Sequence, residues 1–410
     1  MTVRALIRPL PMALLVGLVA QALFAFRLGT PSKLMFDEVH YVPAARAILA
    51  LSHPINAEHP LLGKTLIALG IALFGDNAIG WRALSTLAGT ATVLGVYAIV
   101  WRLFGGVRTA AIGAALTIVN GTVFVQARIG MLDGFMAAFV VGAVAAMVWG
   151  MRGRAVAWWA LGCVLLGLAV GVKWAAAPYV AYAGAAFLLL KRRRPDRWPG
   201  LGRVAALVIL GLASATAYLL TFAPAFFYAD RPLTLPALFP LQLEMYRLQT
   251  QVLPAHTYQS EWWSWPLLLR PIWYLYEPVD GARRGVLLVG NPAVMWGGLV
   301  AVAACLWAFV RCGDQRLGGV AMLWIGSYAV WAIIPKSLGF FYYYYVPSIW
   351  LSVAIAAAFQ RYARDRLDGI DETLLIVAVA TFLYFYPILA ATPLANANSF
   401  RRWTWFDGWV

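Results

Sequence analysis

Long apolar runs separated by short polar stretches dominate this chain. A helix that crosses a bilayer needs about 20 mostly apolar residues, because each residue adds about 1.5 Å along a hydrocarbon core about 30 Å thick. The pattern predicts eleven such helices, at residues 10–28, 81–101, 109–127, 132–150, 155–172, 175–190, 203–223, 292–310, 317–334, 342–360 and 373–392. We therefore expect an all-α polytopic membrane protein with about 11 transmembrane helices.

The stretches between these helices predict one membrane-embedded domain over residues 1–410. Residues 1–28 have a basic start and an apolar core without a clear small-residue cleavage site, so we expect an uncleaved first span. Residues 61–74 are apolar but too short to cross, and we expect an interfacial or re-entrant helix. Residues 29–80 and 223–291 form two long loops, and residues 292–410 form a C-terminal region of four spans.

Composition supports a membrane protein, and the placement of charge indicates its orientation. Apolar and aromatic residues make up 62% of the chain and charged residues 12%, against about 45–50% and about 25% in soluble proteins. The formal net charge of +15 comes from short basic clusters between apolar runs, such as Lys191–Arg194, so we expect no nucleic-acid partner. The positive-inside rule places these clusters and the N-terminus in the cytoplasm and both long loops outside. The three cysteines, Cys163, Cys305 and Cys312, indicate no disulfide framework.

The first long loop carries an acidic pair in the sequence Phe36-Asp37-Glu38-Val39-His40. Adjacent side chains on a helix point about 100° apart, so Asp37 and Glu38 cannot both face one substrate atom. One could act on a substrate while the other orients a cation or the loop. The alternative is a solvated acidic helix start, which suits the helix dipole.

Four basic residues lie near predicted membrane boundaries: Lys64, Arg128, Lys173 and Lys336. Each lysine could extend its charge to the interface or contact a phosphate. Arg128 needs a partner at that depth, and Asp133 is the obvious one. A structural ion pair and a substrate contact are both open there.

Polar and aromatic residues complete the candidate chemistry. Glu58 and His59 precede Lys64 in the first loop, and His256, Trp262 and Trp263 lie in a tryptophan-rich segment of the second loop. Tyr342–Tyr345, with Tyr343 inside the run, follow Lys336. Such aromatics form interfacial belts, and they also stack on sugar rings. Carboxylates, cations and aromatics at one external interface suit cleavage of a sugar–phosphate bond on a lipid carrier.

The order and spacing of these motifs resemble the protein O-mannosyltransferases of the glycosyltransferase C superfamily, and the bacterial members in particular. The family's Asp-Glu pair matches Phe36–His40, its His-Pro-Pro-Leu-Gly-Lys block matches His59–Lys64, and its Gln-x-Arg-Ile-x-x-Leu-Asp stretch matches Gln126–Asp133. Its Val-Lys-Trp element matches Val172–Trp174, its tryptophan-rich block matches His256–Pro266, and its Gly-Asn-Pro matches Gly290–Pro292. Leu61 replaces the second proline, no MIR domain interrupts the second loop, and Phe341–Tyr345 lack the usual histidine.

The resemblance implies roles for the candidate residues. Asp37 would be the catalytic base, with Glu38 supporting the acceptor or the loop. Lys64, Arg128, Lys173, Lys336 and Tyr343 would bind the donor phosphate or sugar, Lys64 and Arg128 alternatively holding the first loop. Glu58, His59, Asp133, His256, Trp262 and Trp263 would support the acceptor or the loop.

It also implies a polyprenyl- or dolichyl-phosphate mannose donor and transfer, with inversion, to serine or threonine of an exported polypeptide. Glu58, His59 and His256 match no standard zinc spacing, so we expect no metal or other cofactor. A related transferase acting on a glycolipid or lipid A is the alternative. A transporter or flippase would show a repeat and polar helices at the midplane, and the sequence shows neither. It gives no oligomeric state.

Overall fold

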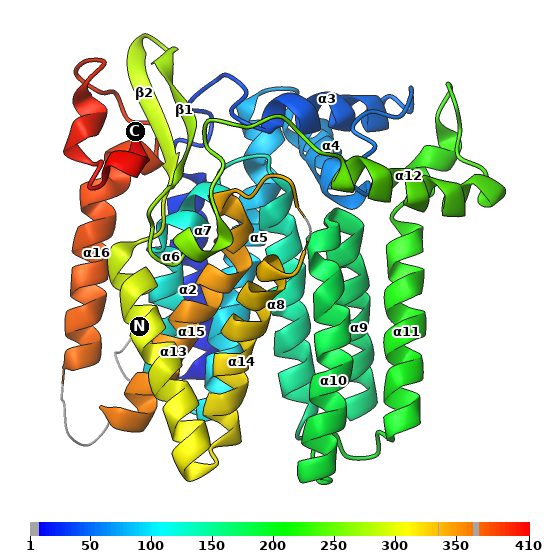
Figure 1. Ribbon diagram of the computed structural model, residues 1–410, viewed down its shortest axis with the longest axis vertical. Helices are drawn as coiled ribbons and strands as arrows, with labels where there is room; N and C mark the ends of the chain where they lie inside the picture. Colours follow the sequence, from blue (N-terminus) through cyan, green and yellow to red (C-terminus); the bar gives the residue numbers. More distant parts are fainter. Residues whose placement is uncertain (1–7, 335, 364–368) are drawn as a thin grey trace. The chain divides into compact units, whose positions relative to one another are not determined.

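The computed structural model describes residues 8–334, 336–363 and 369–410, which form two compact units interleaved along the chain (Figure 1). Unit 1 comprises residues 1–36, 96–129 and 252–410, and unit 2 comprises residues 37–95 and 130–251. Helix α5 (Ala78–Phe104) contributes its first part to unit 2 and its last part to unit 1. The assignment of the whole chain to one domain stays a prediction, and the first seven residues of the expected N-terminal signal-like segment lie outside the described residues.

Unit 1 is built around one buried helix. Its helices are α2 (Pro9–Ala25), α6 (Val107–Ile118), α7 (Gly121–Gln126), α13 (Pro292–Cys312), α14 (Gln315–Ala329), α15 (Tyr345–Tyr362) and α16 (Ile370–Leu389). Helix α15 packs against α6, α13 and α14. The stretch around it is 89% buried, so α15 forms the core of this unit. Short 3-10 turns η4 (Trp262–Ser264), η5 (Val330–Ala332) and η6 (Phe341–Tyr344) lie in the connections, and η7 (Ser399–Arg402) and η8 (Asp407–Trp409) lie in the segment after α16.

A β-hairpin lies in the second long loop, although the sequence analysis predicted an all-α protein. Strands β1 (Ile272–Val279) and β2 (Ala282–Leu288) pair antiparallel, with Val279 opposite Ala282. The turn residues Asp280 and Gly281 have φ values of 50° and 73°, as a two-residue type I′ turn requires. The Trp273 indole donates to the Trp409 carbonyl at 2.8 Å, so the C-terminal segment lies beside the hairpin (Figure 1).

Unit 2 contains α3 (Glu38–Leu49), α4 (Leu62–Phe74), the start of α5, and α8 (Leu132–Gly150), α9 (Ala155–Val172), α10 (Ala177–Arg193), α11 (Arg203–Leu220) and α12 (Leu238–Thr250), with turns η1 (Trp174–Ala176), η2 (Ala223–Phe227) and η3 (Leu235–Ala237). Helix α9 packs between α8 and α11. A Cβ atom on Gly167 of α9 would lie 2.2 Å from the Ser214 carbonyl oxygen of α11. Small residues let helix backbones approach this closely.

The hydrophobic pattern predicts the positions of the helical segments. Within the described residues, eight helices are long and apolar enough to cross a membrane, and the expectation of an integral membrane protein is confirmed. Each of the eleven expected segments contains a helix, although the count of eleven spans stays a prediction. The segment at 109–127 is divided, since α6 ends at Ile118 and α7 starts at Gly121. Leu62–Phe74 forms a separate 13-residue helix, too short to cross by itself.

Candidate active site

Asp37 is the residue immediately before helix α3, and its side chain makes no capping hydrogen bond. Asp37 is partly exposed, and its Oδ2 accepts a long hydrogen bond of 3.4 Å from the Tyr41 hydroxyl one turn later. The preceding residue, Phe36, has a φ of 47°, which a bulky residue adopts only where its surroundings impose it. Phe36 stacks on Tyr274 with 4.4 Å between ring centroids, a contact within unit 1 that fixes the turn.

Surrounding protein raises the pKa of Asp37 to about 6 from an ordinary value of 3.8. Burial is the largest cause, because it penalises the charged carboxylate. Lys173 and His40 lower the pKa, Asp133 raises it, and the Tyr41 hydrogen bond lowers it slightly. Asp37 is therefore a stronger proton acceptor than an ordinary carboxylate and is still ionised at neutral pH.

Glu38 points into the protein. Its side chain is fully buried, and Arg82 of α5 donates two hydrogen bonds of 2.7 Å to its two oxygens. The Gly130 amide donates to the same carboxylate at 2.8 Å. Bidentate arginine–carboxylate contacts fix geometry in addition to neutralising charge. Glu38 thus fixes the first turn of α3, while Asp37 stays accessible.

A second buried ion pair joins α8 to the end of α9. Lys173 donates to both carboxylate oxygens of Asp133, each at 2.9 Å. Both side chains are buried, and both influence the pKa of Asp37. The expected partner of Asp133 was Arg128, so the structure gives this carboxylate a different cation. Each of these two charges needs a partner at membrane depth, and each is paired with a residue 40 positions away along the chain.

Lys64 holds the first loop. Its ammonium is fully buried and donates to the carbonyl oxygens of Asn56 at 2.6 Å and His59 at 2.8 Å. One residue earlier, Gly63 lets α4 approach its neighbours, because a Cβ atom there would lie 2.6 Å from Leu132. Of the two implied roles for Lys64, the described contacts match the support of the loop.

Glu58 and His59 are also tied to helix α12. The Gln249 side-chain amide donates to the Glu58 carbonyl at 2.6 Å and lies 2.8 Å from Nδ1 of His59. The rings of Tyr41 and His59 lie 6.1 Å apart. Through Tyr41, this loop is linked to Asp37.

Arg128 belongs to unit 1 and contacts the end of helix α2. Its guanidinium donates to the carbonyl oxygens of Phe24 at 2.6 Å and Phe26 at 2.7 Å. These are carbonyls that the last turn of a helix leaves without a partner in the helix. A positive charge there also complements the helix dipole. The described contacts of Arg128 therefore hold backbone at the end of the first helix.

The remaining candidates form an aromatic cluster within unit 1. The Lys336 ammonium lies 5.8 Å from the Tyr343 ring centroid, and Tyr343 stacks on Trp331 at 4.4 Å. His256 packs its ring against Phe340 at 5.3 Å. Trp262 is partly exposed and Trp263 is more exposed, at 54%. Exposed indoles and stacked phenols provide flat apolar surfaces of the kind that sugars contact.

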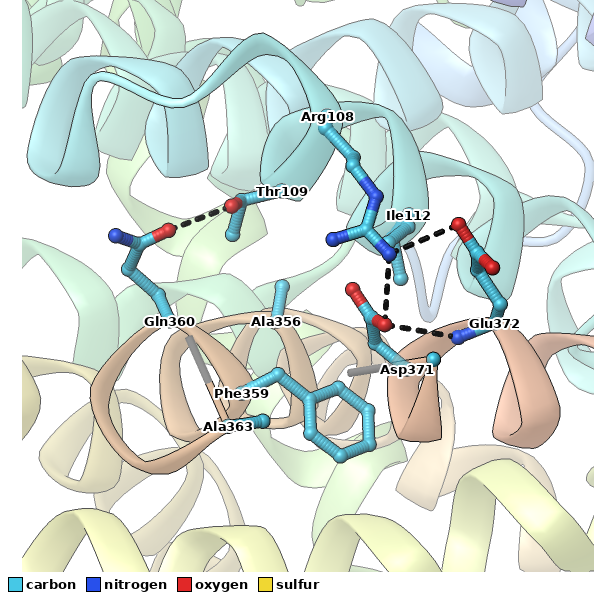
Figure 2. A pocket seen from close by; sticks show the side chains of 10 residues that line it. Arg108, Thr109, Ile112, Ala356, Phe359, Gln360, Ala363, Asp371 and Glu372 are labelled. Atoms are coloured by element: carbon cyan, nitrogen blue, oxygen red, sulfur yellow. Dashed lines mark hydrogen bonds and ion pairs between the residues drawn. The ribbon is translucent and has the colours of Figure 1, made fainter. Parts of the chain in front are cut away.

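A pocket of about 330 Å³ lies elsewhere in unit 1 (Figure 2). Arg108 donates to Asp371 at 2.8 Å and to Glu372 at 2.9 Å, and Thr109 donates to Gln360 at 2.7 Å. Gln360 lies near the last turn of α15, whereas Tyr343 precedes its first turn. The pocket is therefore at the opposite end of this helix from the aromatic cluster. Within the described residues no group of three metal-ligating side chains occurs, and metal-free chemistry stays a prediction.

Sequence reasoning missed Arg82, Tyr41 and Gln249 as supporting residues. No local motif marks Arg82, which lies inside an apolar run. An arginine inside such a run is itself a signal, since it requires an acidic partner. Tyr41 is detectable by its spacing, because residues four apart share a helix face.

Solved structures identify the fold. The Saccharomyces cerevisiae protein O-mannosyltransferase Pmt1-Pmt2 complex bound to the sugar donor matches 98% of this chain and 92% of its own chain, with a TM-score of 0.82 and 13% identity. ArnT from Cupriavidus metallidurans bound to undecaprenyl phosphate matches 96% of this chain and 67% of its own, with a TM-score of 0.60 and 17% identity. The chain has the glycosyltransferase C fold of membrane-embedded sugar transferases.

Sequence relatives identify the family. The model of dolichyl-phosphate-mannose-protein mannosyltransferases matches residues 58–229, and the model of the C-terminal four-span region of protein O-mannosyltransferase matches residues 234–320. The polyprenol-phosphate-mannose–protein mannosyltransferase of Mycobacterium tuberculosis is 30% identical over 93% of this chain and 87% of its own length. That of Mycolicibacterium smegmatis is 28% identical over 93% and 88%. The chain belongs to the protein O-mannosyltransferase family and is a glycosyltransferase.

Proposed function

We propose that this enzyme transfers mannose from a polyprenyl-phosphate-mannose donor to serine or threonine hydroxyls of exported proteins, with inversion at the anomeric carbon. The names of its full-length relatives support the sugar, the carrier and the protein acceptor. The observation that carries the mechanism is Asp37, a partly exposed carboxylate with a pKa of about 6 beside the buried Asp133–Lys173 pair.

The reaction forms one carbon–oxygen bond and breaks another. The acceptor hydroxyl oxygen attacks the anomeric carbon, and its proton passes to the Asp37 carboxylate. The bond between the anomeric carbon and the phosphate oxygen breaks, and its electron pair stays on the lipid phosphate. General-base help of this type contributes about 10²–10⁴-fold in rate.

Fixed positive charge stabilises the departing phosphate most strongly in a site with little water. Lys336 with Tyr343 are candidates in unit 1, where the ammonium lies 5.8 Å from the ring centroid. Lys173, which is paired with Asp133, is the candidate in unit 2 because its positive charge acts at Asp37. Lys64 and Arg128 already donate to backbone carbonyls, so we assign them to holding the first loop and helix α2.

Orientation follows from charge. The basic clusters favour a cytoplasmic N-terminus, and we infer that Asp37, which follows the first apolar helix, faces the periplasmic or extracellular side. That side is where an exported polypeptide is available after it crosses the membrane. The donor's lipid tail keeps it in the same bilayer.

A glycolipid acceptor is the second candidate. The undecaprenyl phosphate-aminoarabinose transferase of Pseudomonas fluorescens is 30% identical over 38% of this chain and 27% of its own length. The mannosyltransferase relatives match over 93% of this chain, and this difference in coverage favours the protein acceptor.

The test uses membranes that contain the full chain, radiolabelled polyprenyl-phosphate mannose and a serine/threonine-rich peptide. We expect label in the peptide, and we expect Asp37→Asn to lower transfer at least about 100-fold, because the base is lost. Asp230→Asn is the matched control, since Asp230 is an exposed carboxylate of the same unit that pairs only with its neighbour Arg231 in the described contacts. Its transfer rate should match the unaltered enzyme.

Two results would contradict the proposal. Label in a glycolipid without label in the peptide would refute the protein acceptor. Near-normal transfer by Asp37→Asn, in protein inserted at normal levels, would refute the assignment of the base.

A further inference from the structure

Helix α12 of unit 2 has three distinct faces. Successive residues of an α-helix lie about 100° apart around its axis, so the residues of α12 can be grouped by the direction in which they point. The face that packs on the protein contains Leu238, Leu241, Gln242, Met245, Leu248 and Gln249. The second face contains Phe239, Leu243 and Tyr246, with Thr250 at its end, and the third contains Pro240, Glu244 and Arg247.

The inward face is hydrogen-bonded to the neighbours of the candidate catalytic residues at two points. Gln249 contacts the Glu58 carbonyl and the His59 ring, as described above. Gln242 accepts a hydrogen bond from the Tyr218 hydroxyl, which in turn accepts one of 2.9 Å from the Trp174 indole. Trp174 follows Lys173 directly. One helix thus supports both the His59 loop and the residue next to Lys173.

The second face is apolar and uncovered. Phe239 is 71% exposed, Leu243 54% and Tyr246 57%. The third face is polar, with Glu244 and Arg247 paired at 3.5 Å. A helix that lies in the plane of a membrane interface needs this division, with an apolar face toward the acyl chains and a charged face toward water.

Helix α11, to which α12 is hydrogen-bonded, also exposes apolar side chains. Helix α11 belongs to a candidate membrane span that is only 28% buried, and Leu212, Leu219 and Leu220 are exposed along it. The Tyr218–Gln242 hydrogen bond joins the two helices. Figure 1 shows α12 lying across the end of α11. A helix turned in this way at the end of a span suits the depth of the lipid headgroups.

We propose that α12 is a membrane-surface helix whose Phe239, Leu243 and Tyr246 insert among the bilayer lipids, and that this contact braces the loop of His59 and the end of α9 beside Asp37. The lipid contact stands independently, whereas the bracing of a catalytic site rests on the proposed function.

Spin labels in lipid nanodiscs test the lipid contact. Cys163 and Cys305 are buried and Cys312 is exposed, so Cys312→Ser provides the background for Leu243→Cys and the matched control Arg247→Cys. We expect the label at 243 to be relaxed more by oxygen, which dissolves in lipid, than by a water-soluble nickel complex. The label at 247 should show the reverse order. Equal or greater relaxation of the 243 label by nickel would overturn the proposal, and so would an immobile label protected from both, which indicates a protein partner.

Transfer assays test the bracing. Phe239→Ser combined with Leu243→Ser should lower transfer severalfold, whereas Glu244→Gln combined with Arg247→Gln should leave it unchanged. Normal transfer by the serine variant would refute the bracing. The spin-label measurement needs no substrate, so it distinguishes failure of the lipid contact from failure of the proposed function. If only the proposed function is wrong, the unaltered chain will show α12 in contact with lipid and will transfer no mannose.

Discussion

At Asp37, opposing electrostatic effects act on one carboxylate. Burial raises its pKa, and electrostatic interactions with Lys173 and His40 lower it, with a net value of about 6. Because the pKa in the folded protein lies above the ordinary 3.8, the ionised form costs stability above pH 6, by about 3 kcal/mol for a shift of this size. The protein tolerates this cost at the position where a strong base is useful.

The raised pKa predicts an acid limit to activity. Only ionised Asp37 accepts a proton, so kcat/KM should be constant above pH 7 and should fall tenfold per pH unit below about pH 6. The measurement is transfer to peptide from pH 4.5 to 8, with circular dichroism to confirm that the protein stays folded. An acid limit near pH 4 would contradict the effect of burial.

Lys173→Gln provides the control for this profile. Removing the cation takes away a charge that lowers the pKa of Asp37 and leaves Asp133, which raises it. Loss of this positive charge raises the pKa of Asp37, so the acid limit should move to higher pH. A shift to lower pH would mean that another group sets the profile.

The Glu38–Arg82 pair predicts a large loss of stability on removal of one partner. Arg82→Gln would leave the fully buried Glu38 without its bidentate donor, and breaking such pairs costs about 3–5 kcal/mol. Thermal unfolding in nanodiscs should show a lower midpoint. Arg82→Gln with Glu38→Gln removes both charges and should recover part of the loss, and no recovery would show that packing, not charge, is responsible.

At the scale of elements, glycine sets the distance between α9 and α11. A Cβ atom on Gly167 would lie 2.2 Å from a backbone oxygen of α11 and 2.8 Å from the Ala217 side chain. A backbone oxygen cannot rotate away, so an added methyl group must push the helices apart.

Gly167→Ala should therefore lower the thermal midpoint, since forced overpacking costs about 1–3 kcal/mol. Gly211→Ala on α11 is the matched control, because a Cβ atom there meets nothing within 4 Å. Alanine is the better helix former, so this control should be neutral or slightly stabilising. Equal midpoints for both variants would contradict close packing at Gly167.

At the scale of the whole molecule, the two units hold different parts of the candidate chemistry. Asp37, Glu38, Lys64, Asp133 and Lys173 belong to unit 2, while Arg128, Lys336, Tyr343 and the tryptophan-rich segment belong to unit 1. The similarity to a mannosyltransferase relative covers 93% of this chain and therefore includes residues of both units.

The proposed function predicts a change in the exported proteins of the cell when the enzyme is absent. Deleting the chain should remove hexose from serine and threonine residues of exported proteins, as measured by mass spectrometry of intact glycopeptides. Restoring the unaltered chain should return the modification, and restoring Asp37→Asn should not. Unchanged glycopeptides after deletion would refute the protein acceptor.

The sequence by itself determined the helical segments, the acidic pair before α3 and the membrane location, because each depends on a local run of residues. The hairpin was detectable as well, since Asp280-Gly281 follows Ile272–Val279, which is rich in aromatic and β-branched residues, and precedes the apolar stretch Val286–Val289. Only the tertiary structure decided the partners: Lys173 for Asp133, Arg82 for Glu38, and carbonyl oxygens for Lys64 and Arg128. Helices surrounded by lipid and protein are apolar on all sides, so their pattern does not show which face packs where.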